Sequence, residues 1–276
     1  MSVTNTTDLK IAAIQMVSSA NFNENLQCAK RLTIDAVKEG ANLVILPEYF
    51  ALMGLKEEDK FEYVEKHQEG AMQSLFSQLA AQLGIWIVAG THPIESDEPL
   101  RPFGRCYVFD QQGKVVCWYD KIHLFDVMVG DNQGSYCESK YTKAGQQVIN
   151  FETPWGKMGL AVCYDLRFPE LFRKHAEQGC EILIMPAAFT YKTGKQHWQV
   201  LIKARAIENL CYFVASAQGG KHENGRETWG HSCVVSPWGE VIEELPSGEG
   251  YVLASLNREK LALLRKEFPV LTHKKL

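Results

Sequence analysis

Three side chains with complementary chemistry lie far apart in the sequence, each directly after a short apolar segment. They are Glu48, Lys121 and Cys163. A cysteine sulfur can attack an acyl carbon, a carboxylate can accept the thiol proton, and an ammonium group can stabilise a negatively charged oxygen. Together, these groups suit the hydrolysis of an amide through a thioester intermediate.

The segments that precede these residues predict where they lie in the fold. Residues 42–46, 115–119 and 157–162 have the length and apolar character of buried β-strands. Ligands of open α/β sheets bind beyond the carboxyl ends of the strands. We therefore expect the three side chains to converge on one site, because all three share this placement.

Cys163 differs from most of the eight cysteines in its surroundings. It lies between a predicted strand and a helix that begins near Phe168 and Pro169, so a sharp turn would expose its sulfur. A nearby helix N-terminus and an ammonium group would both favour the thiolate. No cysteine pair has C-x-x-C spacing, so we expect reduced thiols. The ordinary prediction, a small buried apolar side chain, is kept for Cys28, Cys117, Cys180, Cys211 and Cys233.

The roles of Glu48 and Lys121 stay open from the residues alone. A carboxylate is a competent base when apolar neighbours raise its pKa, and the segment around Glu48 is apolar. Lys121 and the backbone N–H of Tyr164 could stabilise an oxyanion. The alternatives are an acidic residue at a helix N-terminus for Glu48 and a surface lysine for Lys121.

The overall composition excludes several classes of protein. The chain has 276 residues, 46% hydrophobic and 22% charged, with a net charge of −4, so it has no basic character that would indicate nucleic-acid binding. No apolar run reaches the roughly 18 residues that a membrane span needs, and residues 1–8 resemble no signal peptide. The histidines show no metal-binding spacing. We expect a cytoplasmic protein without metal or cofactor.

Apolar segments alternate with helix-period segments along the whole chain, which is typical of sheets covered by helices. We predict one domain over residues 1–276, with two sheets packed face to face and helices outside. The residues 121–147 show no periodicity and should form a functional loop.

We predict strands at residues 9–16, 42–46, 85–89, 106–110, 115–119, 157–162, 181–185, 211–216, 231–236 and 251–255. We predict helices at residues 23–38, 71–83, 168–177, 194–209 and 257–266. Turns at 111–114 and 237–240 predict hairpins, the second joining 231–236 to 251–255.

At the three reactive residues, the sequence resembles the nitrilase superfamily of carbon–nitrogen hydrolases. The glutamate motif is matched by Leu-Pro-Glu at 46–48 and the lysine motif by Tyr-Asp-Lys-Ile-His-Leu-Phe-Asp at 119–126. The cysteine motif is matched by Gly-Leu-Ala-Val-Cys-Tyr-Asp-Leu-Arg-Phe-Pro-Glu at 159–170. The three motifs in this order are highly specific, and the resemblance covers nearly the whole chain.

The resemblance implies further features. The fold would be an α/β four-layer α-β-β-α sandwich, and the protein a homodimer or a larger homo-oligomer. A second glutamate, Glu138, would act as a positioning carboxylate or accessory base. Two carboxylates beside Lys121 would keep it charged when buried.

Four residues are predicted to contact substrate: Tyr164, Arg167, Phe189 and Thr190. Arg167 could hold a substrate carboxylate with both ends of its guanidinium, or could instead fix its own loop to Asp165 or Glu170. The two interpretations of Arg167 stay open.

The predicted reaction has two steps. Glu48 takes the proton of Cys163, the thiolate attacks the amide carbon, ammonia leaves, and water then cleaves the thioester. The segments 186–190, 193–198, 217–222 and 229–232 resemble the branch that acts on deaminated glutathione.

Several alternatives remain beside this prediction. The sister omega-amidases act on α-ketoglutaramate or α-ketosuccinamate, and a nitrile substrate would react by the same first step. A binding protein that keeps the fold without catalysis is a rival from another class. A thiol redox protein is another, although no resolving cysteine lies near Cys163 in the sequence.

Overall fold

Fourteen strands and five α-helices make up most of the structure, a computed structural model that describes residues 8–131 and 134–275. Residues 1–7 lie outside the described residues, and with them most of the segment that was predicted to resemble no signal peptide. The strands of the first sheet are β1 Asp8–Gln15, β2 Leu43–Ile45, β3 Trp86–Ile94, β4 Phe103–Phe109, β5 Val115–Asp120 and β14 Gly250–Asn257. The strands of the second sheet are β8 Asn150–Thr153, β9 Gly156–Leu160, β10 Ile182–Ala187, β11 Tyr212–Ala217, β12 Ser232–Val235 and β13 Val241–Leu245.

The helices follow the periodic segments closely. They are α1 Phe22–Lys38, α2 Ala71–Leu83, α3 Pro169–Glu177, α4 Tyr191–Asn209 and α5 Arg258–Glu267. The side chain of Asn21 accepts a hydrogen bond from the backbone N–H of Glu24 at the start of α1, and Thr190 caps α4 in the same way. Pro169 occupies the first turn of α3, where its missing N–H costs nothing.

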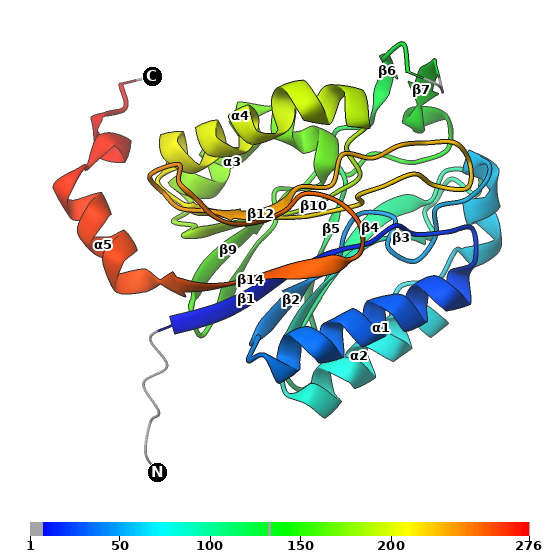
Figure 1. Cartoon of the computed structure of the whole chain (residues 1–276), viewed down its shortest axis with the longest axis horizontal. Coiled ribbons are helices and arrows are strands. Elements are labelled where there is room, and N and C mark those ends of the chain that lie inside the picture. Colours follow the sequence, from blue (N-terminus) through cyan, green and yellow to red (C-terminus); the bar gives the residue numbers. More distant parts are fainter. Residues whose placement is uncertain (1–7, 132–133, 276) are drawn as a thin grey trace.

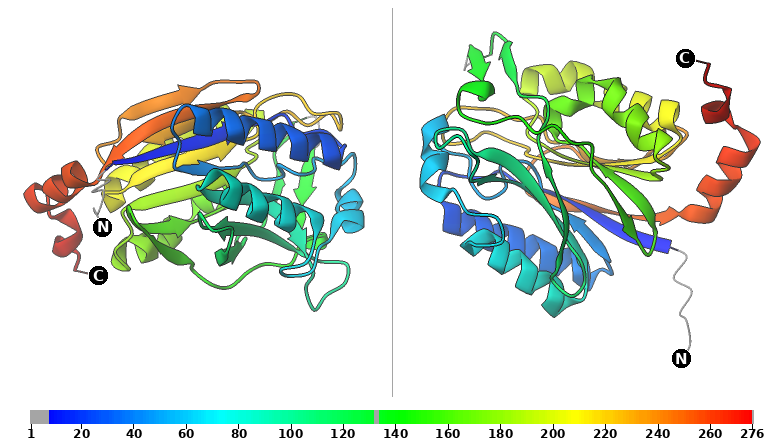
Figure 2. Two further views of the ribbon diagram at one scale, coloured as in Figure 1. Left: turned by 90° about the horizontal axis from the view of Figure 1, so that it is seen from below. Right: turned by 180° about the vertical axis from the view of Figure 1, so that it is seen from behind.

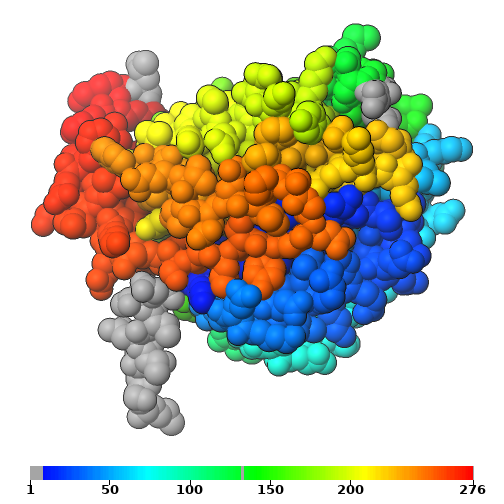
Figure 3. Space-filling model, in the orientation of Figure 1, coloured from blue at the N-terminus to red at the C-terminus, as the bar shows by residue number. Residues whose placement is uncertain are grey.

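The two sheets lie face to face between two layers of helices (Figure 1). The first sheet has the order β14-β1-β2-β3-β4-β5, and the second has β13-β12-β11-β10-β9-β8. Helices α1 and α2 cover the outer face of the first sheet, and α3 and α4 cover the second; the same layers are seen from behind in Figure 2. This arrangement confirms the predicted α-β-β-α sandwich. The C-terminal segment with α5 lies at one end of the molecule (Figure 3).

Strand β1 explains why there are two hydrophobic cores. Its side chains alternate, so Leu9 and Ile11 pack between the sheets, whereas Ala12 and Ile14 pack against the outer helices. Both faces of the central strands are therefore buried, as their nearly continuous apolar sequences predict.

Strand directions bring the predicted reactive residues to one edge. Strands β1, β2 and β3 are parallel, and β5 runs in the same direction because two antiparallel pairings separate it from β3. In the second sheet β9, β10 and β11 are parallel. The carboxyl ends of β2, β5 and β9 carry Glu48, Lys121 and Cys163 respectively.

One predicted hairpin was wrong. The turn at residues 237–240 joins β12 to β13, a strand that was not predicted because its sequence is rich in charge. Strand β14 instead crosses to the first sheet and pairs antiparallel with β1. The aperiodic residues 121–147 contain the hairpin of β6 Asp126–Met128 and β7 Ser135–Cys137, then the 3-10 helix η2 Glu138–Lys140. Strands this short leave no detectable period.

Candidate active site

A buried cluster of three charged side chains lies at the carboxyl ends of the strands. The ammonium nitrogen of Lys121 donates to Glu48 Oε1 at 2.8 Å and to Glu138 Oε1 and Oε2 at 3.0 and 2.8 Å. Burial disfavours the charged form of Lys121, but Glu138 and Glu48 outweigh burial and raise its pKa well above the usual value. Lys121 is therefore a permanent positive charge, and the alternative of a surface lysine is excluded.

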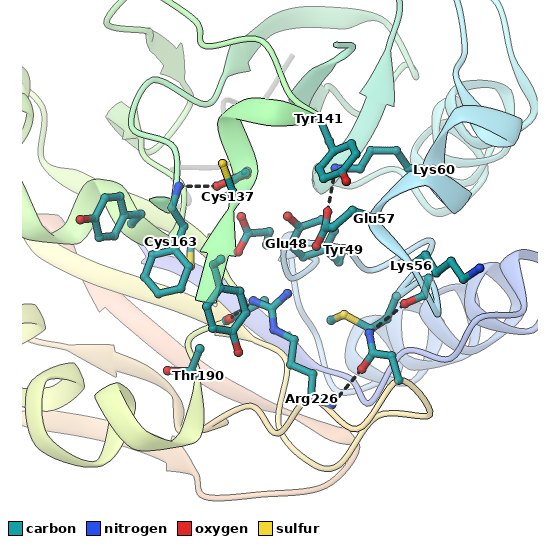
Figure 4. Close-up of a pocket in the computed structure, with 18 of the residues that line it drawn as sticks. Glu48, Tyr49, Lys56, Glu57, Lys60, Cys137, Tyr141, Cys163, Thr190 and Arg226 are labelled. Atoms are coloured by element: carbon teal, nitrogen blue, oxygen red, sulfur yellow. Dashed lines mark hydrogen bonds and ion pairs between the residues drawn. The ribbon is translucent and has the colours of Figure 1, made fainter. Parts of the chain in front are cut away.

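Cys163 completes the cluster from the second sheet. It follows β9 by three residues and opens the short 3-10 helix η3 Cys163–Arg167 with a positive φ of 48°, a backbone conformation that is strained for a non-glycine residue. This turn brings the sulfur to Glu48 at the edge of the inter-sheet core; Figure 4 shows both residues at the same end of the pocket.

Burial dominates the electrostatics of Cys163. Burial and the adjacent Glu48 raise the pKa of the thiol well above 9.0, against the opposing effects of Lys121 and the backbone N–H of Ala188. Lys121 favours the thiolate, as expected, but a fully buried sulfur loses more hydration than one ammonium group restores. A protonated thiol needs a base in the same step.

Glu48 is placed to be that base. Its Oε1 accepts from Lys121, while Oε2 is buried and accepts no other hydrogen bond from the described residues. The side chain interacts with the thiol of Cys163. A buried carboxylate oxygen without a donor is costly, and the thiol proton is the group it lacks.

The side chain of Gln218 fixes the backbone at Glu48. Its side-chain amide donates to the carbonyl oxygen of Glu48 at 3.0 Å and to Ser18 Oγ at 2.8 Å, and it is fully buried. It lies just beyond β11, so it ties the two sheets together at the site. It is neither a surface residue nor a member of the pocket wall.

Asp165 links the lysine and cysteine motifs. Its carboxylate accepts from the backbone N–H of Val162 at 2.7 Å, the hydroxyl of Tyr119 at 2.7 Å and the backbone N–H of His123 at 3.1 Å. The ring nitrogen Nδ1 of His123 lies 2.6 Å from the same carboxylate. These bonds fix the strained turn at Cys163 against the chain that carries Lys121, and none of them involves Arg167.

A cavity of about 340 Å³ opens over the cluster. Its lining includes Tyr164, Phe189 and Thr190, three of the residues predicted to contact substrate. Arg167 is not among the lining residues: its guanidinium lies 3.2 Å from His197 Nδ1 and stacks on the rings of Tyr164 and Phe189. The structure thus brings seven of the eight predicted site residues together.

Sequence reasoning missed the charged wall of this cavity. Glu57 and Lys60, an ion pair at 3.0 Å on the 3-10 helix η1 Glu57–Tyr63, line it together with Arg226. Neither η1 nor the loop of Arg226 has a periodic sequence. The one available signal was an arginine in the segment between β11 and β12, where several glycines mark a loop.

The comparisons with known proteins agree with this geometry. The sequence matches the model of the carbon–nitrogen hydrolase family over residues 10–266. The chain belongs to this family. It is 40% identical over 266 residues to a deaminated glutathione amidase from Synechocystis, covering 95% of this chain and 97% of that protein.

Solved structures give the same result. The NitFhit protein of Caenorhabditis elegans superposes with a TM-score of 0.89 at 33% identity, over 97% of this chain and 65% of that one. Saccharomyces cerevisiae Nit3, a member of the nitrilase superfamily, gives a TM-score of 0.86 at 30% identity, over 95% of both chains. This carbon–nitrogen hydrolase is therefore an amide-cleaving enzyme, as the three motifs predicted.

Among residues 8–131 and 134–275, no group of acidic, histidine or cysteine side chains is arranged to hold a metal ion, and no helix could span a membrane.

Proposed function

We propose that this hydrolase cleaves the amide bond of a small, carboxylate-bearing keto acid amide, with deaminated glutathione as the first candidate. The observation that carries the proposal is the buried cluster of Glu48, Lys121 and Glu138 next to the thiol of Cys163, at the base of a cavity of about 340 Å³. The Synechocystis relative, 40% identical, is named for that substrate.

In the first step, Glu48 Oε2 takes the proton of the Cys163 thiol while the sulfur attacks the amide carbon. Negative charge develops on the carbonyl oxygen, where Lys121 supplies a positive charge and the backbone N–H of Tyr164 supplies a directional hydrogen bond. The bond to nitrogen then breaks, and protonated Glu48 gives its proton to the leaving nitrogen. The product is a thioester on Cys163.

In the second step, Glu48 removes a proton from water, and the resulting hydroxide attacks the thioester carbon. The carbon–sulfur bond breaks, and the sulfur recovers its proton from Glu48. The sum is amide plus water giving acid plus amine. With a primary amide the leaving group is ammonia, as predicted, whereas deaminated glutathione releases the amine of cysteinylglycine.

Glu138 acts in this scheme as a positioning residue. It accepts two hydrogen bonds from Lys121, and its Oε2 also accepts from the backbone N–H of Phe125 at 2.7 Å. A carboxylate held in this way keeps the ammonium group oriented and charged. The predicted roles of Phe189 and Thr190 as substrate contacts, and of Arg167, stay predictions.

A panel of substrates tests the proposal. Wild type and Cys163→Ala are assayed on deaminated glutathione, α-ketoglutaramate, α-ketosuccinamate and a neutral nitrile. We expect the highest kcat/KM on deaminated glutathione and no turnover by the variant. A preference for α-ketoglutaramate would replace this substrate with that of an omega-amidase. No turnover of any compound would favour a binding protein.

We also propose a homodimer or larger homo-oligomer in the cytoplasm, built from one domain over residues 1–276. These proposals rest on the family resemblance and on the cysteines, all eight of which are free thiols in the structure. Light scattering of the purified protein measures the oligomer directly.

A further inference from the structure

Arg226 is a buried cation in the wall of the cavity. The residue is 9% exposed, and its side chain extends from its loop toward the end of the pocket that holds Glu48 and Cys163 (Figure 4). The guanidinium lies 5.6 Å from the ring of Tyr49 and 5.4 Å from that of Tyr136. Both rings stabilise the charge, but neither can accept an ionic hydrogen bond from the edge of the guanidinium.

The guanidinium has few partners of its own. Its Nη2 donates to the carbonyl oxygen of Ala188 at 3.0 Å, and its buried Nε has no acceptor among the described residues. No described carboxylate lies within ion-pair distance of it. Glu57 attracts the guanidinium electrostatically from the same wall, but it forms its ion pair with Lys60, at 3.0 Å. Buried cations without a counter-ion are rare outside binding sites.

We propose that Arg226 binds the carboxylate at the keto-acid end of the substrate. This inference rests on the proposed function and deepens it. A planar guanidinium with free edge donors matches a carboxylate with two parallel hydrogen bonds. The bound anion would supply the counter-ion that the protein itself does not.

The length of the substrate agrees with this placement. The N–H of Ala188 donates toward the sulfur of Cys163, and its carbonyl oxygen accepts from Arg226, so one residue and two hydrogen bonds connect the two groups. The sulfur of Cys163 and the guanidinium of Arg226 are therefore separated by roughly 10 Å at most. A five-carbon keto-acyl chain spans roughly 5 Å between its end carbons, and the attack and the ion pair add roughly 3 Å each. The extended substrate would thus reach about 11 Å, so it is long enough to connect the two groups when its chain is slightly bent.

The competing explanation is that Arg226 only fixes the backbone of Ala188 beside the nucleophile. Loss of that support would slow every substrate alike. Loss of a carboxylate anchor would slow only substrates that carry the carboxylate. A pair of substrates that differ in this single group therefore separates the two explanations.

The experiment compares deaminated glutathione with 4-oxopentanoyl-cysteinylglycine, in which a methyl group replaces the keto-acid carboxylate. Both release cysteinylglycine, so one assay serves for both. In Arg226→Gln we expect kcat/KM to fall at least about 100-fold on deaminated glutathione and less than about 5-fold on the methyl ketone. Arg226→Lys keeps the positive charge but not the two parallel hydrogen-bond donors of the guanidinium, so its loss of kcat/KM on deaminated glutathione should be intermediate.

The matched comparison is Arg167→Gln, the other arginine near the site. Equal losses on the two substrates in Arg226→Gln would overturn the inference, and so would a larger change in the substrate ratio for Arg167→Gln. If Arg226→Gln does not fold, the ratio measured for Arg226→Lys decides alone. A wild type without activity on deaminated glutathione, but active on neutral amides, would overturn the proposed function and this inference with it.

Discussion

The catalytic cluster and the cavity wall are built in different ways. Glu48, Lys121 and Cys163 each follow a strand by one to three residues, so the two sheets determine where they lie. The wall consists of η1, the segment from β7 to η2, and the loop that carries Arg226. The difference indicates that the sheets supply the bond-breaking chemistry while the loops select the substrate. Changes in the cluster should therefore act on kcat, and changes in the wall on KM.

The largest effect is expected for Glu48→Gln. The amide keeps a hydrogen bond to Lys121 but cannot accept the thiol proton, so kcat should fall by about 100-fold to 10,000-fold. Steady-state kinetics on the best substrate measure the change. The matched control is Glu244→Gln, a half-buried carboxylate that pairs with His231 outside the pocket. A Glu48 variant with kcat within a few-fold of wild type would contradict the role of base.

A smaller effect is expected for Asp165→Asn. The side-chain amide brings a donor to a site where every neighbour is a donor, so the turn at Cys163 should shift. We expect kcat to fall about 10-fold to 100-fold with little change in KM, together with a lower Tm. Tyr119→Phe removes a single bond of the network and should lose less of both. A rise in KM alone would place Asp165 with the wall instead of the cluster.

The wall is tested by Lys60→Met. Without this ammonium group, Glu57 would lose its ion-pair partner, and its negative charge would repel a substrate carboxylate more strongly. We expect KM to rise about 3-fold to 10-fold and kcat to stay within about 2-fold. Lys38→Met, on the exposed surface of α1, is the control and should change neither constant. A loss in kcat would break the division between cluster and wall.

The smallest effect on catalysis is expected for three buried histidines outside the catalytic cluster, which act on stability instead. Burial lowers the pKa of His92 to about 3 and of His175 and His222 to about 4, below the usual 6.5. The unfolded chain binds these protons more readily than the folded one, so stability is lost as the pH falls from 6.5 toward 4. Each histidine contributes up to roughly 3 kcal/mol to this loss.

Urea unfolding between pH 4 and pH 8 measures this contribution. His175→Gln should flatten the dependence while leaving KM near the wild-type value, because His175 contacts Leu160 at the end of β9 and lies outside the pocket. An unchanged pH dependence in the variant would show that His175 is not the neutral buried group described here.

The contrast between cluster and wall also explains what could be predicted from the sequence. Apolar strands leave a strong pattern, so the sequence could predict that the three residues beyond their carboxyl ends lie close together. Arg226 and Glu57 lie on loops, where contacts between distant segments decide the conformation and no period marks them. Strand β13 was missed for a related reason: it lies at the edge of its sheet and its sequence, Val-Ile-Glu-Glu-Leu, is half exposed.

The direction of the pKa shift of Cys163 could not be predicted from the sequence for another reason. The sequence places an ammonium group and a helix start near the sulfur, and both favour the thiolate. How much water the fold removes from the sulfur is a tertiary property, and here it prevails. A neutral thiol reacts only when its proton has an acceptor, which is the role predicted for Glu48.

The central claim is that the sulfur of Cys163 carries the acyl group during turnover. Rapid acid quenching of the enzyme with deaminated glutathione, followed by mass spectrometry of its peptides, measures this directly. We predict an acyl adduct on the peptide that contains Cys163, formed before the steady state and absent from Cys163→Ala. Full turnover without such an adduct, or an adduct on another cysteine, would contradict the account.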